Sequence, residues 1–429
     1  MLQKTIYLAL IVLIAVPGFS QTPITIEECR QEALANNKDI QSSVLELQKA
    51  EASVKEARTG FLPAIDGSAN AMYIPNLEEL KQFGIEKEDL EVYQAQFSAQ
   101  QPIYAGGKVR LSNKMAKKRV DIADKAREQQ RAEIIMKTDE AYWDLVAMQE
   151  QKKVVEKFTE ALDSLEEQLQ ANYEQGLVPK SELLKVTVQK NEAEVTAMEV
   201  KNAVQLLQMN LARIIGRNLD EPLRAISEPD FPVDNDEPTF SQEPVVPGNR
   251  PEIQIMENQV DMAQMETKMT RADYLPELGA QVSYGYLKVP DISDGSWQLN
   301  AAVQLSIPII HWREKKHKMK KAEISEQMTK LDLQNAREQI SLEIRKTWLK
   351  LQEGIEKIQL ARKNLEEATE SLSEVEISYN AGLNTITDLL NARVARQRAD
   401  ASLIEAQSNY QVLKSSWLKA IGKLDKKYQ

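Results

Sequence analysis

The sequence predicts an exported, mainly α-helical protein that carries a smaller membrane-type β component and is built as two copies of one unit. Three observations predict this class. The N-terminus has the pattern of a secretory leader, landmark residues recur at fixed offsets, and long helix-forming stretches are separated by short segments in which apolar and polar residues alternate. Together they describe a duplicated chain that leaves the cytoplasm and combines helical hairpins with strands.

Residues 1–20 have the composition of a signal peptide. Lys4 precedes an apolar core from Ile6 to Val16, and small or helix-breaking residues follow up to Ser20. A helix that crosses a bilayer needs about 20 apolar residues, more than this core supplies. We therefore expect cleavage before Gln21 rather than a membrane anchor. No cysteine stands at that point, which gives no support for a lipid-modified N-terminus.

Composition argues against several functional classes. The formal charge of -11 becomes -12 when Lys4 leaves with the leader, and this acidic balance disfavours nucleic acid as a partner. Cys29 is the only cysteine, so the chain has no internal disulfide, and we expect a small buried helix residue there. His311 and His317 are six residues apart and lie on different helix faces, so we expect neither a metal site nor a cofactor.

Landmark residues divide the chain into two copies. Between Arg58 and Arg271 the offset is 213, and between Pro102 and Pro308, and onward, it is 206. We therefore predict a first copy at 21–216, an irregular connector rich in proline and acids at 217–250, a second copy at 251–422 and a tail at 423–429. The first of these offsets rests on Arg58, Phe61, Leu62 and Pro63, which recur as Arg271, Tyr274, Leu275 and Pro276.

Four segments alternate apolar and polar residues: about 65–74, 92–101, 278–287 and 296–307. Their length suits tilted membrane strands with an apolar outer face and a polar lumen face. A soluble two-layer β-domain is the alternative, and the scarcity of charges on the polar faces favours the barrel. Four strands cannot close, and an open edge in lipid is costly, so the barrel must be shared between chains. Residues 75–90 and 288–295 would be exterior loops.

Two long helical hairpins are predicted, at about 108–215 and 314–421. No helix breaker occurs between Lys108 and Tyr173, a length of roughly 100 Å at about 1.5 Å per residue. Apolar residues spaced by three and four predict coiled-coil seams, so these helices are walls rather than cofactor sites. The second-copy seams are Ile344, Trp348, Leu351, Ile355 and Ile358, and Leu403, Ala406, Tyr410, Leu413 and Trp417.

Each hairpin turns at a short break, Gly176-Leu177-Val178-Pro179 in the first copy and Gly382-Leu383-Asn384-Thr385 in the second. We expect each glycine to end one helix in a left-handed conformation, and Ser181 or Thr385 to cap the next. An acid follows six residues after each glycine, Glu182 and Asp388. In a symmetric assembly these acids would form rings, although an acid in the first turn of a helix also favours its dipole.

A basic run follows the second strand of each copy, from Lys108 to Arg119 and from Arg313 to Lys321. In an exported acidic chain we interpret these runs as a collar near lipid head groups. A generic solvated face is the alternative.

In these combined features the chain resembles the TolC or outer-membrane efflux protein family over its whole mature length. The resemblance rests on the tandem repeat, on the Phe61-Leu62-Pro63 and Tyr274-Leu275-Pro276 segments, and on the two Gly-Leu tips followed by Leu-Leu. It also rests on the motif from Gln101 to Gly107. The second copy departs from the family's Gly-Gly pattern, because His311-Trp312-Arg313 follows Ile310.

The resemblance implies a homotrimer in the outer membrane that extends into the periplasm. Each chain would give four strands to a twelve-stranded barrel and four helices to a tunnel of twelve. It implies an exit channel of an efflux or type I secretion system, whose tips dock to a periplasmic adaptor driven by an inner-membrane pump. The tunnel would close near the tips, at Asp388, with Asn391 neutral one turn further on and Glu182 compensating from the first copy.

Two other functions are weighed against this one. A periplasmic coiled-coil adaptor would show a glycine-rich lipoyl-like module interrupted by one hairpin, and no duplicated membrane-length strands. An exported hydrolase would need a nucleophile elbow, a metal motif or paired carboxylates, and the sequence has none of these constellations. The sequence therefore favours a passive channel that is not an enzyme.

Overall fold

The computed structural model describes residues 22–75, 89–226, 250–290 and 293–425. The predicted signal peptide, most of the first exterior loop and most of the connector lie outside the described residues. The chain forms two compact units. In its described residues, unit 1 contains 22–40, 131–226 and 344–425, and unit 2 contains 41–75, 89–130, 250–290 and 293–343.

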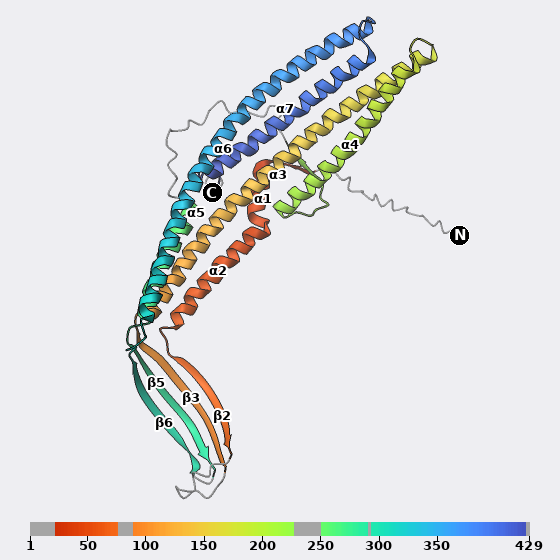
Figure 1. The fold of residues 1–429 in the computed structure, drawn as a ribbon. Helices are drawn as coiled ribbons and strands as arrows, with labels where there is room; N and C mark the ends of the chain where they lie inside the picture. Colours follow the sequence, from red (N-terminus) through yellow and green to blue (C-terminus); the bar gives the residue numbers. More distant parts are fainter. Residues whose placement is uncertain (1–21, 76–88, 227–249, 291–292, 426–429) are drawn as a thin grey trace, which may run out of the picture. The chain divides into compact units, whose positions relative to one another are not determined.

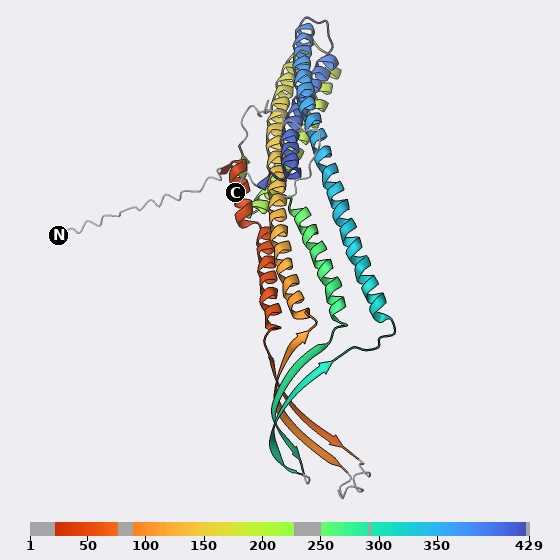
Figure 2. The same ribbon diagram turned by 90° about the vertical axis from the view of Figure 1, so that its left-hand side faces the viewer.

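Unit 2 contains a four-stranded antiparallel sheet of order β2-β3-β5-β6 (Figures 1 and 2). The strands are β2 Ala64–Ile74, β3 Leu90–Ala105, β5 Glu277–Val289 and β6 Ser293–Ser306. All four begin and end within a few residues of the predicted segments. The first copy's second strand pairs with the second copy's first strand, so the two copies meet at the β3–β5 ladder. The outer edges of β2 and β6 have no partner strand within the described residues.

The sheet has one apolar and one polar face. Along β3, Tyr93 and Phe97 are exposed, whereas Gln94, Gln96 and Ser98 on the opposite face are half-buried. Figure 2 shows the strands bending. Along β3 the polar face is the less exposed one, and a polar lumen face with an apolar outer face is the arrangement that a membrane barrel requires.

In unit 2, ion pairs join lysines at the start of the first long helix to α5 and to residues that follow α5. Helix α5 spans Pro251–Ala272, and α2 spans Lys38–Thr59. Lys108 Nζ lies 2.9 Å from Asp273 and 2.6 Å from Glu277, and Lys118 Nζ lies 2.8 Å from Asp261. Part of the first basic run is thus neutralised by acids from the second copy.

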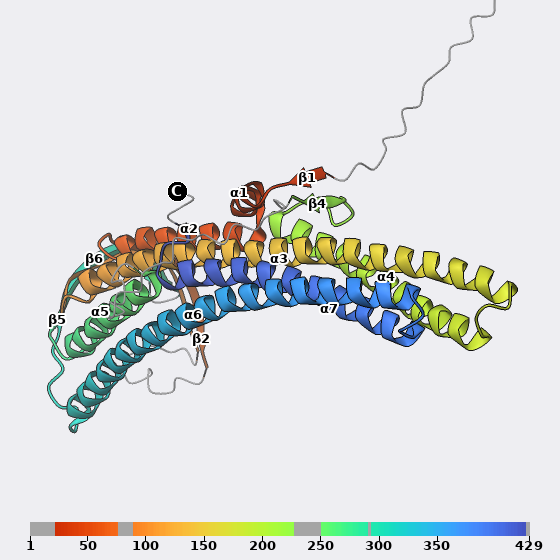
Figure 3. The ribbon, with the colours of Figure 1, turned by 90° about the horizontal axis from the view of Figure 1, so that it is seen from above.

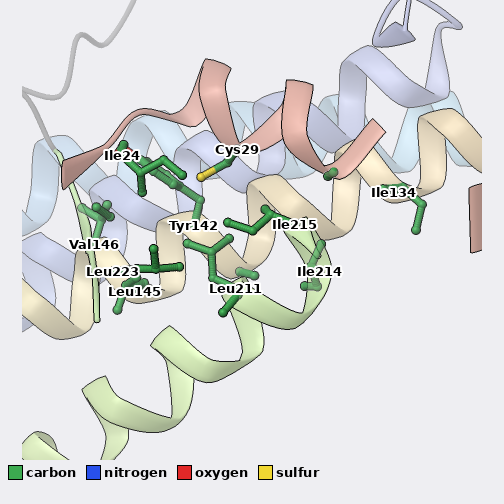
Figure 4. Packing of buried hydrophobic residues seen from close by; sticks show 14 of the residues in the cluster. Ile24, Cys29, Ile134, Tyr142, Leu145, Val146, Leu211, Ile214, Ile215 and Leu223 are labelled. Carbon is green, nitrogen blue, oxygen red and sulfur yellow. The ribbon is translucent and has the colours of Figure 1, made fainter. Parts of the chain in front are cut away.

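Unit 1 has a core built around the N-terminal segment (Figure 4). Short strands β1 Thr22–Ile24 and β4 Leu223–Ala225 pair in parallel, and α1 Ile26–Asn36 follows β1. The Tyr142 hydroxyl donates to the carbonyl oxygens of Ile24 and Ile226. Cys29 is fully buried in α1, as predicted. Neither strand was predicted, and β4 corrects the expectation that the connector is irregular from its first residues.

The two predicted hairpins are present. Helices α3 Lys108–Glu174 and α4 Lys180–Ile215 form the first, and α6 Glu314–Asn380 and α7 Ile386–Ala420 form the second (Figure 3). The α6–α7 seam packs as predicted, with Leu351, Ile358 and Tyr410 buried at its centre. Among the described helices, none is both long enough and apolar enough to cross a membrane.

The first residues of the C-terminal tail also belong to the core of unit 1, which the sequence did not suggest. Leu424 is buried, and Asp425 accepts hydrogen bonds from the Arg131 guanidinium on α3. Lys419, near the end of α7, pairs with Glu133 on α3.

Candidate functional site

The two hairpin tips, at the same end of the unit 1 helices in Figure 1, form the candidate site. Gly176 and Gly382 end α3 and α6 with φ of 75° and 74°. In the first tip the Leu177 N–H donates to Asn172 O, and in the second the Leu383 N–H donates to Ser378 O, both at 2.9 Å. This is the glycine-dependent helix ending that the sequence predicted for both copies.

The helices after the tips begin differently. Thr385 caps α7 in a capping box: its hydroxyl accepts from the Asp388 N–H, and Asp388 Oδ2 accepts from the Thr385 N–H at 2.9 Å and from the hydroxyl at 2.7 Å. The predicted Ser181 cap is wrong, because the N-cap is Pro179 and α4 begins at Lys180, so Ser181 already lies inside the helix. Proline has no N–H for Glu182 to accept, so the reciprocal box cannot form in the first copy.

Asp388 is therefore held by the backbone and hydroxyl of Thr385. These hydrogen bonds to the ionised carboxylate, the side-chain bond first, hold the pKa of Asp388 below its ordinary value. Asn391 is exposed one turn further along α7. Asp388 is thus a helix-capping acid, one of the two roles considered for it from the sequence, and its carboxylate lies at the protein surface.

The two tips are packed together by residues of both copies. Leu183 and Val186 of α4 share a buried apolar cluster with Ile386 and Leu389 of α7. Lys185 Nζ donates to the Thr387 hydroxyl at 2.9 Å. Burial, followed by the negative charge of Glu182, raises the pKa of Tyr379 at the end of α6. Glu182 therefore lies near a second-copy tyrosine that the sequence analysis did not select.

Charged residues behind the tips hold the helices of each hairpin together, and the sequence did not predict these contacts. Lys190 on α4 lies 2.7 Å from Asp163 and 3.0 Å from Glu166 on α3. Arg393 on α7 donates to Ala161 O at 3.0 Å and to Glu376 at 3.1 Å, and so joins the two hairpins. Coiled-coil spacing locates such positions on a helix surface but does not say which acid faces which base across helices.

The two copies use the same turn between sheet and helix, with different residues. Gly106 and Gly107 have φ of 62° and 86°, and their repeat counterparts Trp312 and Arg313 have φ of 38° and 68°. The turn that two glycines build in the first copy is thus preserved without them. A non-glycine residue in such a conformation costs about 1 to 3 kcal/mol, and such residues cluster at functional sites.

Comparisons with known proteins agree with this geometry. The profile of the outer membrane efflux protein family matches residues 29–217 and 246–422. The alkaline protease secretion protein AprF of Pseudomonas aeruginosa is 23% identical, covering 76% of this chain and 68% of its own. The outer membrane protein TolC of Escherichia coli is 20% identical, covering 92% of this chain and 81% of its own.

Solved structures of outer-membrane channels share the fold. The CmeC channel of Campylobacter jejuni superimposes with a TM-score of 0.79 at 18% identity, over 93% of this chain and 86% of its own. VceC of Vibrio cholerae gives 0.74 at 18% identity, over 92% of this chain and 96% of its own.

A duplicated chain of helical hairpins with a four-stranded, two-faced sheet is the architecture of an outer-membrane channel subunit. The family profile covers most of the chain in two segments, and the chain belongs to the outer membrane efflux protein family. It is an outer-membrane exit channel protein for efflux or secretion, with a helical part that extends into the periplasm. The periplasmic adaptor alternative is overturned by this match.

Proposed function

We propose that three copies of this chain assemble into a passive exit channel with a shared twelve-stranded barrel. The observation that carries this proposal is the sheet of four strands, in which β2 and β6 each expose an unpaired edge among the described residues. Backbone groups at an open edge in lipid lack hydrogen-bond partners, so the edges must be covered. A further copy supplies a complementary strand at each edge, and a ring of copies leaves none open.

Exposed apolar seams on the unit 1 helices support the same assembly. Helix α4 exposes an apolar stripe at helical spacing on the side away from its buried residues, and α6 exposes another. A continuous apolar stripe that is left exposed on a helix surface marks a contact with a partner. The α4 stripe contains Leu184, Val188, Val195, Met198 and Leu206, and the unit 1 part of the α6 stripe contains Leu349 and Leu360.

The tips then have two roles in this proposal. Gly176, Leu177, Val178 and Pro179, with Gly382, Leu383, Asn384 and Thr385, form the surface that docks to a periplasmic adaptor driven by an inner-membrane pump. Exposure of Leu177 and Leu383 supports a docking role. Asp388, Glu182 and Asn391 line the constriction. The chain has no enzymatic activity of its own in this proposal, because the polar groups at the tips cap helices and pair across them.

Conductance of the purified full chain in planar bilayers, combined with its native mass in detergent, tests the proposal. We expect discrete channels from a trimeric species. A monomeric species, or trimers without conductance under any voltage or pH, would overturn it. Asp388→Asn is expected to lower cation preference or blockade by multivalent cations, and unchanged selectivity removes Asp388 from the constriction.

A further inference from the structure

The strained turn at Trp312 and Arg313 presents an indole to the surroundings at the end of the sheet. Trp312 is 92% exposed, and Ile309 and Ile310 before it are 85% and 71% exposed. His311, between them, packs instead against the Tyr274 ring, edge to face at 5.6 Å. The left-handed backbone at Trp312 therefore accompanies a reversal of direction, with His311 held on the protein and Trp312 directed away from it.

The first copy shows that the turn itself does not require a large residue. At Gly106 a side chain is excluded, because an added Cβ would lie 2.8 Å from Ala272 O. At Gly107 the space is open. Two glycines therefore build this turn without strain in the first copy, and the second copy carries tryptophan and arginine in the same conformation. What the second copy gains from the strained residues is the exposed side chains.

Cations follow the indole directly. Lys318 pairs with Glu314 at 2.5 Å, and Lys315 lies over the Tyr274 ring. Arg313, Lys316 and Lys320 are exposed, and no ion pair holds them within the described part of the chain. Because residues four apart share a helix face, Lys316 and Lys320 form a cationic patch at the first turns of α6, and Arg313 directly precedes this helix.

The order of these groups follows the order of a bilayer surface. Leu305 and Ile307 continue the apolar face of β6, exposed Ile309 and Ile310 follow, then comes the indole, and then the free cations. Tryptophan is enriched at the head-group level of membrane proteins, and nearby lysine and arginine bind anionic lipid. We propose that Trp312 with Arg313, Lys316 and Lys320 binds the phosphate head group of an anionic phospholipid in the periplasmic leaflet.

Fluorescence quenching tests where the indole lies. The full chain is placed in nanodiscs of phosphatidylcholine and phosphatidylglycerol, and the Trp312 signal is taken as the difference between wild type and Trp312→Phe. Trp297→Phe isolates a strand tryptophan as the control. We expect lipids brominated near the head group to quench the Trp312 component most. Quenching by aqueous iodide instead, or protection from both quenchers by a neighbouring copy, would overturn the proposal.

A second measurement separates lipid binding from folding. The double variant Trp312→Gly with Arg313→Gly copies the first copy's turn, so it should fold without loss of thermal stability while retaining less phosphatidylglycerol in native mass spectrometry. Lys316→Gln and Lys320→Gln should each lower that retention about fivefold, the order of magnitude for one cation at an anionic surface. Lys363→Gln, an exposed lysine elsewhere on α6, is the control.

Unchanged retention in the glycine and glutamine variants would remove the lipid site. The proposal rests on outer-membrane placement and not on the trimer, so conductance of the same variants reports on the proposed channel separately.

Discussion

Asp388 combines a structural and an electrostatic property in one side chain. It completes the capping box of α7, and the same hydrogen bonds from Thr385 lower its pKa below the ordinary 3.8. Because the pKa falls on folding, the cap stabilises the tip fully at neutral pH and is lost as pH drops through the lowered value. The carboxylate therefore keeps its negative charge in mildly acidic conditions.

This gives a pH-dependent prediction for the channel. The hydrogen bonds from Thr385 lower the pKa of Asp388, so the cation preference that depends on Asp388 should be lost at a lower pH than for the same carboxylate without these bonds. Thr385→Val removes the hydroxyl bond, so the loss should move to higher pH, whereas Thr385→Ser keeps the hydroxyl and should behave as wild type. Reversal potentials measured across a pH series check this, and a wild-type-like profile from the valine variant contradicts it.

Arg30 and Asp139 form a buried ion pair that sequence periodicity did not suggest. The guanidinium donates to both carboxylate oxygens, at 2.6 and 2.7 Å, and the Ser415 hydroxyl donates to one of them. Asp139 is fully buried. The pair joins α1 to α3 and α7 within unit 1.

Removing one partner leaves the other charge buried. Arg30→Leu is expected to destabilise unit 1 by about 3 to 5 kcal/mol, and the double variant with Asp139→Leu should recover much of the loss. The exposed pair Lys49 and Glu46 offers the control, because Lys49→Ala should change stability by less than about 1 kcal/mol. Urea unfolding measures the differences, and equal effects from Arg30 and Lys49 would count against a structural role for the buried pair.

At the scale of elements, α6 carries two apolar surfaces with different tasks. Leu351 is 2% exposed in the seam with α7, whereas Leu349, two residues earlier, is 64% exposed. Residues two apart in a helix do not face each other. The seam holds the hairpin together, and in the proposed assembly the outer stripe contacts another copy.

Substitutions of the two leucines should therefore have effects in different assays. Leu351→Ala is expected to cost about 2 to 5 kcal/mol in the unfolding of the single chain, from lost burial and a cavity. Leu349→Ala should leave that stability unchanged and lower the temperature at which the trimer dissociates. Dissociation followed by gel mobility and unfolding followed by circular dichroism separate the two effects. Identical losses in both assays would show that the outer stripe belongs to the chain's own core.

At the scale of the whole molecule, the repeat predicts how copies pair. Within the chain, Phe97 of β3 lies opposite Tyr284 of β5. The second strands of the two copies, β3 and β6, are related by the offset of 206, so Phe97 corresponds to Val303. The first strands, β2 and β5, are related by the offset of 213, so Tyr284 corresponds to Ala71. If the contact between copies repeats the contact within the chain, these residues face each other across the joint.

Disulfide trapping tests that register. In a Cys29→Ala background, Ala71→Cys with Val303→Cys should form covalent oligomers up to the trimer on mild oxidation, because residues opposite in antiparallel strands have Cβ atoms about 5 Å apart. The control Ala69→Cys with Val303→Cys is displaced by two residues and should link poorly. Equal linking by both pairs, or better linking by the control, contradicts the predicted register.

The sequence by itself determined the duplication, the strands of the larger sheet and the long helices. Strand alternation located β2, β3, β5 and β6, breaker-free stretches located the long helices, and Gly176 and Gly382 located the tips, because these features depend on local backbone and solvent preferences. Cys29 was also correctly expected inside a helix, since a small apolar side chain is usually buried.

Only the tertiary structure decided which distant groups meet. The β1–β4 pairing, the Arg30–Asp139 pair and the Lys190 ion pairs join residues that are far apart in sequence or on different helices, and spacing along one helix says nothing about its neighbour. The Ser181 cap and the Trp312 turn were also decided only in the structure. The sequence favoured serine as a cap and glycine in the turn, whereas α4 begins at Lys180 behind Pro179 and the second copy keeps the left-handed turn with Trp312 and Arg313.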